Sequence, residues 1–164
     1  MLETKIKVDL GDIERLCKRY PEESRKARES KLTEAVALLE GEVKKRTPWG
    51  AGPIHLRDSI FGDVKIRGQK AVGILGTPLQ HGEPVERGTK PHFPPIGPLA
   101  FWVEKKFGYT GKEARDVAFV IARAISKRGT RAARMFETGF LANEARVQGI
   151  LEEIPAQIIK ELGR

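Results

Sequence analysis

The pattern of apolar and polar positions predicts a short strand and two helices in the first third of the chain. Residues 5–10 alternate polar and apolar side chains, which is typical of a half-buried strand. Apolar residues then recur at helical intervals up to Pro21, and a longer helical run follows over residues 22–46 with one apolar stripe. We expect this helix to end before Pro48, because the residue preceding a proline is driven out of the α region.

A period-two pattern follows in the middle of the chain. Apolar and polar residues alternate over 60–66 and again over 72–75, on either side of a short glycine-containing link at 67–70. Two such runs across a short link predict an antiparallel hairpin at the centre of a small sheet, over about residues 59–76. A further short element is expected at residues 83–86.

The second half of the chain reads as helical. From Pro98 an amphipathic run continues until Gly108 closes it. Thr110, with Glu113 three residues later, has the spacing of a capping box and predicts a helix up to about Arg128.

The apolar face of this helix predicts that it is the core helix of the fold. A last helical run covers residues 147–162, and Pro155 is expected to kink or split it.

These elements predict an α+β fold, because the period-two segment lies between strongly helical segments. We expect a small antiparallel sheet, with its hairpin at about 59–76, packed against the long N-terminal helix and several C-terminal helices. A chain of 164 residues is the size of one domain. No internal repeat is present in the sequence.

Composition indicates the class of protein and where it is expected in the cell. Hydrophobic residues make up 40% and charged residues 32% of the sequence, as in ordinary globular proteins. No apolar run is long enough to span a bilayer and no cleavable signal begins the chain, so we expect it in the cytosol or inside an assembly. The single Cys17 is expected to be a structural thiol.

Positive charge is concentrated in the middle of the sequence. The formal net charge is +8, and the largest share, +4, falls within residues 111–140, which hold seven basic and three acidic residues. Five basic residues there follow one another with no acidic residue between them: Arg123, Lys127, Arg128, Arg131 and Arg134. They predict a surface for phosphates or an acidic partner. The alternative is a solvated helix end, where the helix dipole favours Lys and Arg.

A proline- and glycine-containing segment is the strongest candidate for an interface. It consists of Val85, Glu86, Arg87, Gly88, Thr89, Lys90, Pro91, His92, Phe93, Pro94 and Pro95. Prolines fix φ and remove backbone donors, so we expect a stiff, exposed, non-helical loop on which a partner docks with little loss of entropy. Phe93 is the expected anchor of that contact. The alternative is a plain connector between elements.

Residue patterns for catalysis are scarce. His55, His81 and His92 lie on separate expected loops without ligand spacing, and no Cys pair, HExxH, GxGxxG or Walker loop is present. The alternative is a metal-dependent nuclease, in which these histidines would converge with Asp58 or Glu86. We expect no enzymatic activity, no catalytic or metal-binding residues and no cofactor.

Three segments, in this order and spacing, resemble the minor tail-component proteins of long-tailed bacteriophages and prophages, also called tail-completion or neck proteins. The first is the amphipathic helix that closes on a Thr-Pro, at residues 39–48. After a glycine loop, residues 56–60 resemble the family's G-x-L-x-x-S-I strand entry, and residues 85–89 resemble its V-E-x-G-T segment before a proline loop. An insertion over about 95–128 stretches the usual compact ending, and Arg134–Phe136 stands in place of the family's Pro-Phe.

This resemblance implies a non-enzymatic virion protein that joins the tail tube to the DNA-filled head, assembling as a ring around the DNA channel. It would be found in the phage neck or tail, and in the host cytoplasm during assembly. The implied partners are tail-tube or terminator proteins, head-completion proteins and further copies of itself, with non-specific DNA contact left open and no membrane. The alternative, based only on the basic charge, is a free nucleic-acid-binding protein.

Overall fold

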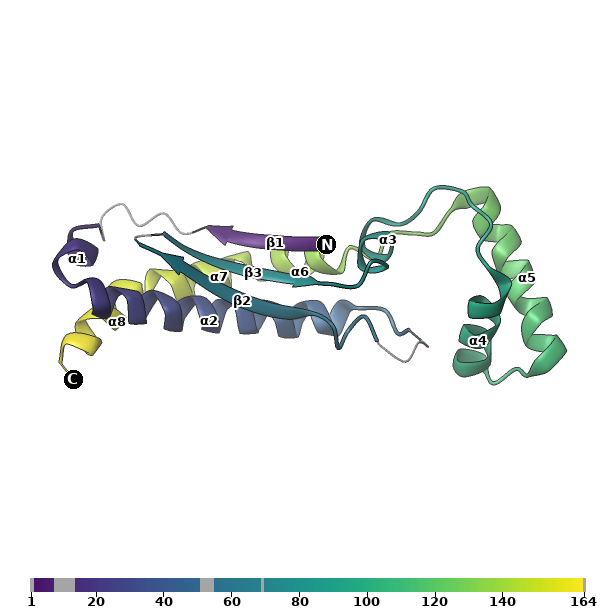
Figure 1. Ribbon diagram of the computed structural model, residues 1–164, viewed down its shortest axis with the longest axis horizontal. Coiled ribbons are helices and arrows are strands. Elements are labelled where there is room, and N and C mark those ends of the chain that lie inside the picture. Colours follow the sequence, from purple (N-terminus) through teal and green to yellow (C-terminus); the bar gives the residue numbers. More distant parts are fainter. Residues whose placement is uncertain (1, 8–13, 51–54, 69, 164) are drawn as a thin grey trace.

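The computed structural model describes residues 2–7, 14–50, 55–68 and 70–163. It shows a sheet covered on one face by helices, with a pair of helices projecting from one end (Figure 1). The described elements are β1 (Leu2–Lys7), α1 (Glu14–Arg19), α2 (Pro21–Arg46), β2 (Phe61–Arg67), β3 (Lys70–Thr77), α3 (Gly82–Arg87), α4 (Ile96–Phe107), α5 (Gly111–Arg128), α6 (Met135–Leu141), α7 (Glu144–Glu152) and α8 (Ile154–Leu162).

The sheet is antiparallel and three-stranded, with β3 in the centre and the order β1-β3-β2. The hairpin expected at 59–76 is confirmed as β2 and β3, paired from Phe61 opposite Gly76 to Arg67 opposite Lys70. Of the strand expected at 5–10, residues 5–7 belong to β1 and residues 8–10 lie outside the described residues. The α+β class is therefore confirmed, with one more strand in the sheet than the hairpin provides.

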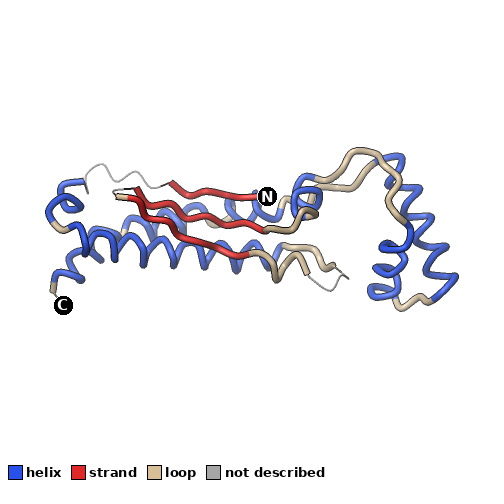
Figure 2. Tube along the Cα trace, viewed as in Figure 1, coloured by secondary structure: helices blue, strands red, loops and turns tan. Residues whose placement is uncertain are grey.

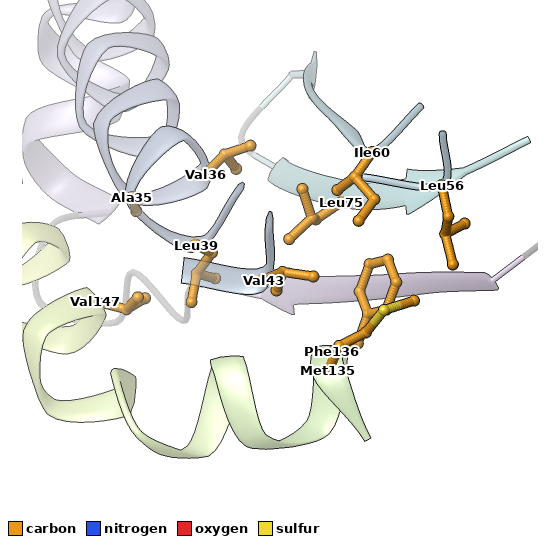
Figure 3. Close-up of a cluster of buried hydrophobic side chains, with 10 residues drawn as sticks. All are labelled: Ala35, Val36, Leu39, Val43, Leu56, Ile60, Leu75, Met135, Phe136 and Val147. Carbon is orange, nitrogen blue, oxygen red and sulfur yellow. The ribbon is translucent and has the colours of Figure 1, made fainter. Parts of the chain in front are cut away.

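The long helix α2 forms the main core with the sheet and the C-terminal helices (Figure 3). Its apolar stripe lies between β3 on one side and α6 and α7 on the other (Figure 1). The buried side chains of this cluster are Ala35, Val36, Leu39, Val43, Leu56, Ile60, Leu75, Met135, Phe136 and Val147. The stripe expected from sequence thus packs against both a sheet and helices.

The edge strand β2 lies very close to α2. A Cβ atom at Gly62 would run into the Val36 side chain, so only glycine allows this approach. The Gly62 N–H donates a hydrogen bond to Glu40 Oε2 at 2.9 Å. Glu40 thereby satisfies a backbone donor at the strand edge.

The C-terminal helices cover the other end of α2. Ile154 and Ile158 of α8 bury themselves with Ala27 of α2 in a second apolar cluster. Lys31 Nζ bridges α2 to this end of the chain through Glu153 Oε2 at 2.6 Å. Pro155 stands in the first turn of α8, so the expected split of the last helical run is confirmed.

Helices α4 and α5 form a hairpin that lies apart from this body (Figure 2). Their shared apolar cluster contains Ala100, Val103, Ala114 and Ala118 and no residue of the main core. The expectation that residues 110–128 form the core helix is therefore wrong: their buried face is lined by alanines that fit closely against α4. Thr110 does stand at the N-terminus of α5, but its side chain makes no capping hydrogen bond.

Candidate interaction surfaces

The segment from Val85 to Pro95 is divided by the structure into a helical part and an extended part. Val85, Glu86 and Arg87 are the last residues of α3, so the expectation that this stretch is wholly non-helical is wrong. The helix ends at Gly88, whose φ of 75° allows a sharp change of chain direction. The remaining residues, 89–95, lead outward to α4.

Glu86 is the clearest exception to the expected exposure of this segment. Its side chain is only 7% exposed, and its two carboxylate oxygens accept hydrogen bonds from the backbone N–H groups of Phe136 and Glu137, both at 3.0 Å. These donors belong to the first turn of α6, where a helix leaves N–H groups without internal partners and favours negative charge. Glu86 is thus a structural cap for a helix 50 residues away in sequence.

Two chain segments pass each other where the body meets the α4–α5 hairpin. Thr89 and Thr130 exchange both backbone hydrogen bonds, at 3.2 and 3.3 Å, and the Ala133 and Arg134 N–H groups donate to the carbonyls of Val85 and Glu86. Gly88 thus lies in close backbone contact with the chain's own return segment, residues 130–134. We call residues 90–131, which run out from this crossing through α4 and α5 and return to it, the arm.

Two glycines make the crossing possible. Gly88 and Gly129 have φ values of 75° and 73° with ψ near 180°, a region that is essentially restricted to glycine. A Cβ at Gly88 would lie 2.5 Å from the Thr130 carbonyl oxygen, and one at Gly129 would overlap the Thr89 carbonyl oxygen. Side chains other than glycine would therefore push the two segments apart.

The outer part of the segment, Lys90–Pro95, is where the expected docking residues lie. Phe93 is 54% exposed and meets Phe119 of α5 edge-to-face, with ring centroids 6.1 Å apart. Phe119 is itself 52% exposed, so the pair forms an apolar spot on the surface of the arm. His92 is turned back on its own backbone, with Nδ1 2.9 Å from the Lys90 carbonyl oxygen.

The five basic residues singled out from sequence are all exposed but are not gathered on one helix face. Arg123, Lys127 and Arg128 belong to the end of α5, whereas Arg131 lies in the return segment. Arg134 precedes α6, has a left-handed φ of 50° and pairs with Glu137 at 3.6 Å. The structure therefore separates Arg134, in the body, from the four residues of the arm.

The arm carries most of the net charge of the chain. It holds nine Lys and Arg residues against three acidic ones, a net charge of +6 out of +8 for the whole sequence. Among the described residues, every ion pair lies in the body and none involves a basic residue of the arm. The arm is therefore a strongly positive surface whose basic residues form no ion pairs with described residues.

Sequence reasoning missed several residues of this surface. Phe119 occupies one exposed side of α5 together with Arg115 and Arg123, each four residues away. Phe101, Phe107 and Tyr109 are further exposed aromatic residues of the arm. The signal available in the sequence was the four-residue spacing of these residues on a helix whose opposite side is rich in alanine.

The three histidines lie on different stretches of the chain. In the parts of the chain that the structure describes, no three His, Cys, Asp or Glu side chains are grouped so as to hold a metal ion. His81 lies just before α3 and His92 on the way to α4, and both are exposed. The half-buried His55 precedes the main-core residue Leu56.

The clearest electrostatic effects on ionisation are in the body. Hydrogen bonds from Lys45 and Arg46 lower the pKa of Glu42 from 4.5 to about 2. Hydrogen bonds to Glu153 and Glu34 raise the pKa of Lys31 above its usual value of 10.5. These groups brace α2 and its contact with α8, so they concern stability.

Comparison of the chain with protein-family models, with characterised proteins and with solved structures found no match. None of the described helices is both long and apolar enough to cross a membrane.

Proposed function

We propose that the chain is a structural, non-enzymatic component of the neck of a long-tailed phage particle, where it joins the tail tube to the head as one subunit of a ring. The order of the three sequence segments that resemble tail-completion proteins supports the proposal. Two of these segments, at 39–48 and 56–60, contribute to the main core, and the third ends at the crossing that carries the arm.

The observation that carries the proposal is the arm. Its pair of helices projects from the body, it carries exposed aromatic side chains, and residues 90–131 have a net charge of +6. Exposed aromatic residues beside arginines are typical of protein interfaces, where they supply most of the binding energy. A ring of identical subunits would give each arm a neighbour, because head-to-tail contacts close into rings.

The role of the segment from 85 to 95 follows from this arrangement. Its inner part, with Glu86, Gly88 and Thr89, holds the arm to the body through hydrogen bonds. Its outer part, with Phe93, supplies the docking contact. The inner part of the segment is therefore a connector, and its outer part is an interface.

The decisive experiment is inactivation of the gene in the phage or prophage that carries it. We expect electron microscopy to show DNA-filled heads and finished tails that remain separate, and joining to be restored by the wild-type protein. Complete particles formed without the protein would rule out a joining role. A free nucleic-acid-binding protein would instead bind DNA tightly by itself, with affinity falling steeply as salt rises.

A further inference from the structure

The positive charge of the arm exceeds what helix stability explains. The helix dipole favours the basic residues in the last turns of α4 and α5. It disfavours Lys112, which lies in the first turn of α5, and it has little effect on Arg115 and Arg123 in the middle of that helix. These three cations have no ion-pair partner among the described residues, so their charge is available to an external anion.

The outer side of α5 presents cations in a row. Four exposed residues follow at four-residue intervals and share one helix face: Arg115, Phe119, Arg123 and Lys127. With a rise of about 1.5 Å per residue, the charged ends of this row are about 18 Å apart. Asp116 lies next to this row without an ion pair to any described residue, and the face remains net positive.

We propose that this face of α5 binds duplex DNA through its phosphate groups, without selecting a base sequence. A row of unpaired cations complements the regular negative charge of a DNA backbone. Helix α5 contains no Asn or Gln, the side chains that pair with adenine in the major groove, and the proposal assigns its Arg and Lys side chains to phosphate groups.

This inference rests on the proposed function for its setting, since a subunit around the DNA channel would meet DNA at close range. The contact itself is a property of the isolated chain and is measured without assembled particles. Phe93 meets Phe119, which belongs to this row, so the protein contact and the DNA contact adjoin on the arm. Under this proposal the aromatic pair docks to protein, and the cations beside it face DNA.

The test is fluorescence anisotropy with a short labelled DNA duplex of mixed sequence, from about 50 to about 200 mM salt. The full-length double variant Arg123→Glu/Lys127→Glu is expected to lose at least about tenfold in affinity, and its slope of log affinity against log salt should become shallower by about two. The affinity of the wild type should not depend on the base sequence of the duplex.

A matched control changes the same amount of charge elsewhere. Arg67 and Lys70 face each other at the β2–β3 turn, at the end of the body opposite the arm (Figure 1). The variant Arg67→Glu/Lys70→Glu should lose less than about threefold in affinity, because its site is outside the binding face. The milder pair Arg123→Gln/Lys127→Gln should show an intermediate loss and replaces the Glu variant if circular dichroism finds that variant unfolded.

Three results would overturn the inference. They are equal losses for the arm and turn variants, no measurable duplex binding by the wild type at low salt, and unchanged DNA binding in an arm variant that fails to join heads to tails. The last result would assign the face to an acidic protein and leave the neck function standing. Conversely, if heads and tails join normally without the gene, the proposed neck function is wrong. The anisotropy measurement then still decides whether the arm binds DNA.

Discussion

At the scale of single residues, the crossing between body and arm depends on backbone geometry that few side chains permit. Gly88 and Gly129 adopt a conformation reserved for glycine, and each lies against the backbone of the other segment. Glu86, two residues before Gly88, caps α6. The three residues together determine how the arm is attached.

Replacing Gly129 by alanine should destabilise the protein. The backbone strain alone is worth about 1–3 kcal/mol, and the overlap with the Thr89 carbonyl adds to it. Urea unfolding should show the loss, and hydrogen exchange should show faster exchange at the Thr89 and Thr130 amides. As a control, Gly149→Ala places a methyl group in open space on α7 and should stabilise by about 0.5–1 kcal/mol. Equal effects of the two changes would contradict the role of Gly129.

Glu86→Ala should cost about 1–3 kcal/mol of unfolding free energy, because two amide donors of α6 lose their acceptor in a buried position. Glu86→Gln should cost less, since one acceptor oxygen remains while the charge is lost. The comparison in urea denaturation is Glu83→Ala, which removes only an exposed ion pair with Arg87 at 3.2 Å and should change stability by less than about 1 kcal/mol. A Glu83 effect as large as that of Glu86 would show that capping is not the cause.

At the scale of elements, the arm and the body have separate apolar clusters. The α4–α5 cluster has small buried side chains with larger, partly buried ones around them, whereas the main core joins α2, the sheet, α6 and α7. The two ends of the arm meet at Thr89 and Thr130, so the body closes on itself without the residues between them.

Replacing residues 91–128 by a short Gly-Ser linker should therefore leave the body folded. We expect a cooperative urea transition with a nearly unchanged midpoint, and a far-ultraviolet circular dichroism spectrum that has lost the helical signal of α4 and α5. The reason is that the removed residues contribute nothing to the main core. A chain that no longer unfolds cooperatively would show that the arm is needed for the fold.

At the scale of the whole molecule, charge and exposed aromatic residues are concentrated at one end. Several basic residues of the body are in ion pairs, whereas no basic residue of the arm is paired with a described residue. This asymmetry supports an assembly in which the body packs as a unit and the arm reaches other components. Substitutions on the arm should therefore disturb assembly and leave folding unchanged.

Phe93→Ala should leave the subunit folded and yield heads and tails that fail to join. Burying this ring in a partner would contribute on the order of 1.5–3 kcal/mol per copy, repeated around the ring. Thermal unfolding checks the fold and electron microscopy checks joining. The control is Phe61→Ala, which removes an equally exposed ring, 53% against 54%, from the outer sheet face. If the Phe93 variant assembles normally, residues 85–95 are a connector and not an interface.

Periodicity alone determined much of the fold. The stripe of α2, the β2–β3 alternation and the break at Pro155 are local signals, because each follows from the geometry of one helix or one hairpin. The exposure of Phe93 likewise followed from its place in a proline-containing segment. These features need no knowledge of what packs where.

Tertiary structure alone decided the rest, because it depends on contacts between residues far apart in sequence. The amphipathic pattern of residues 110–128 shows that one face is buried, but not whether α4 or the sheet buries it. Glu86 looked like an exposed loop residue because its partners lie 50 residues away, at α6. The sequence predicts a helix end at about Arg128, and only the crossing at Thr89 shows why the next residue, Gly129, must be glycine.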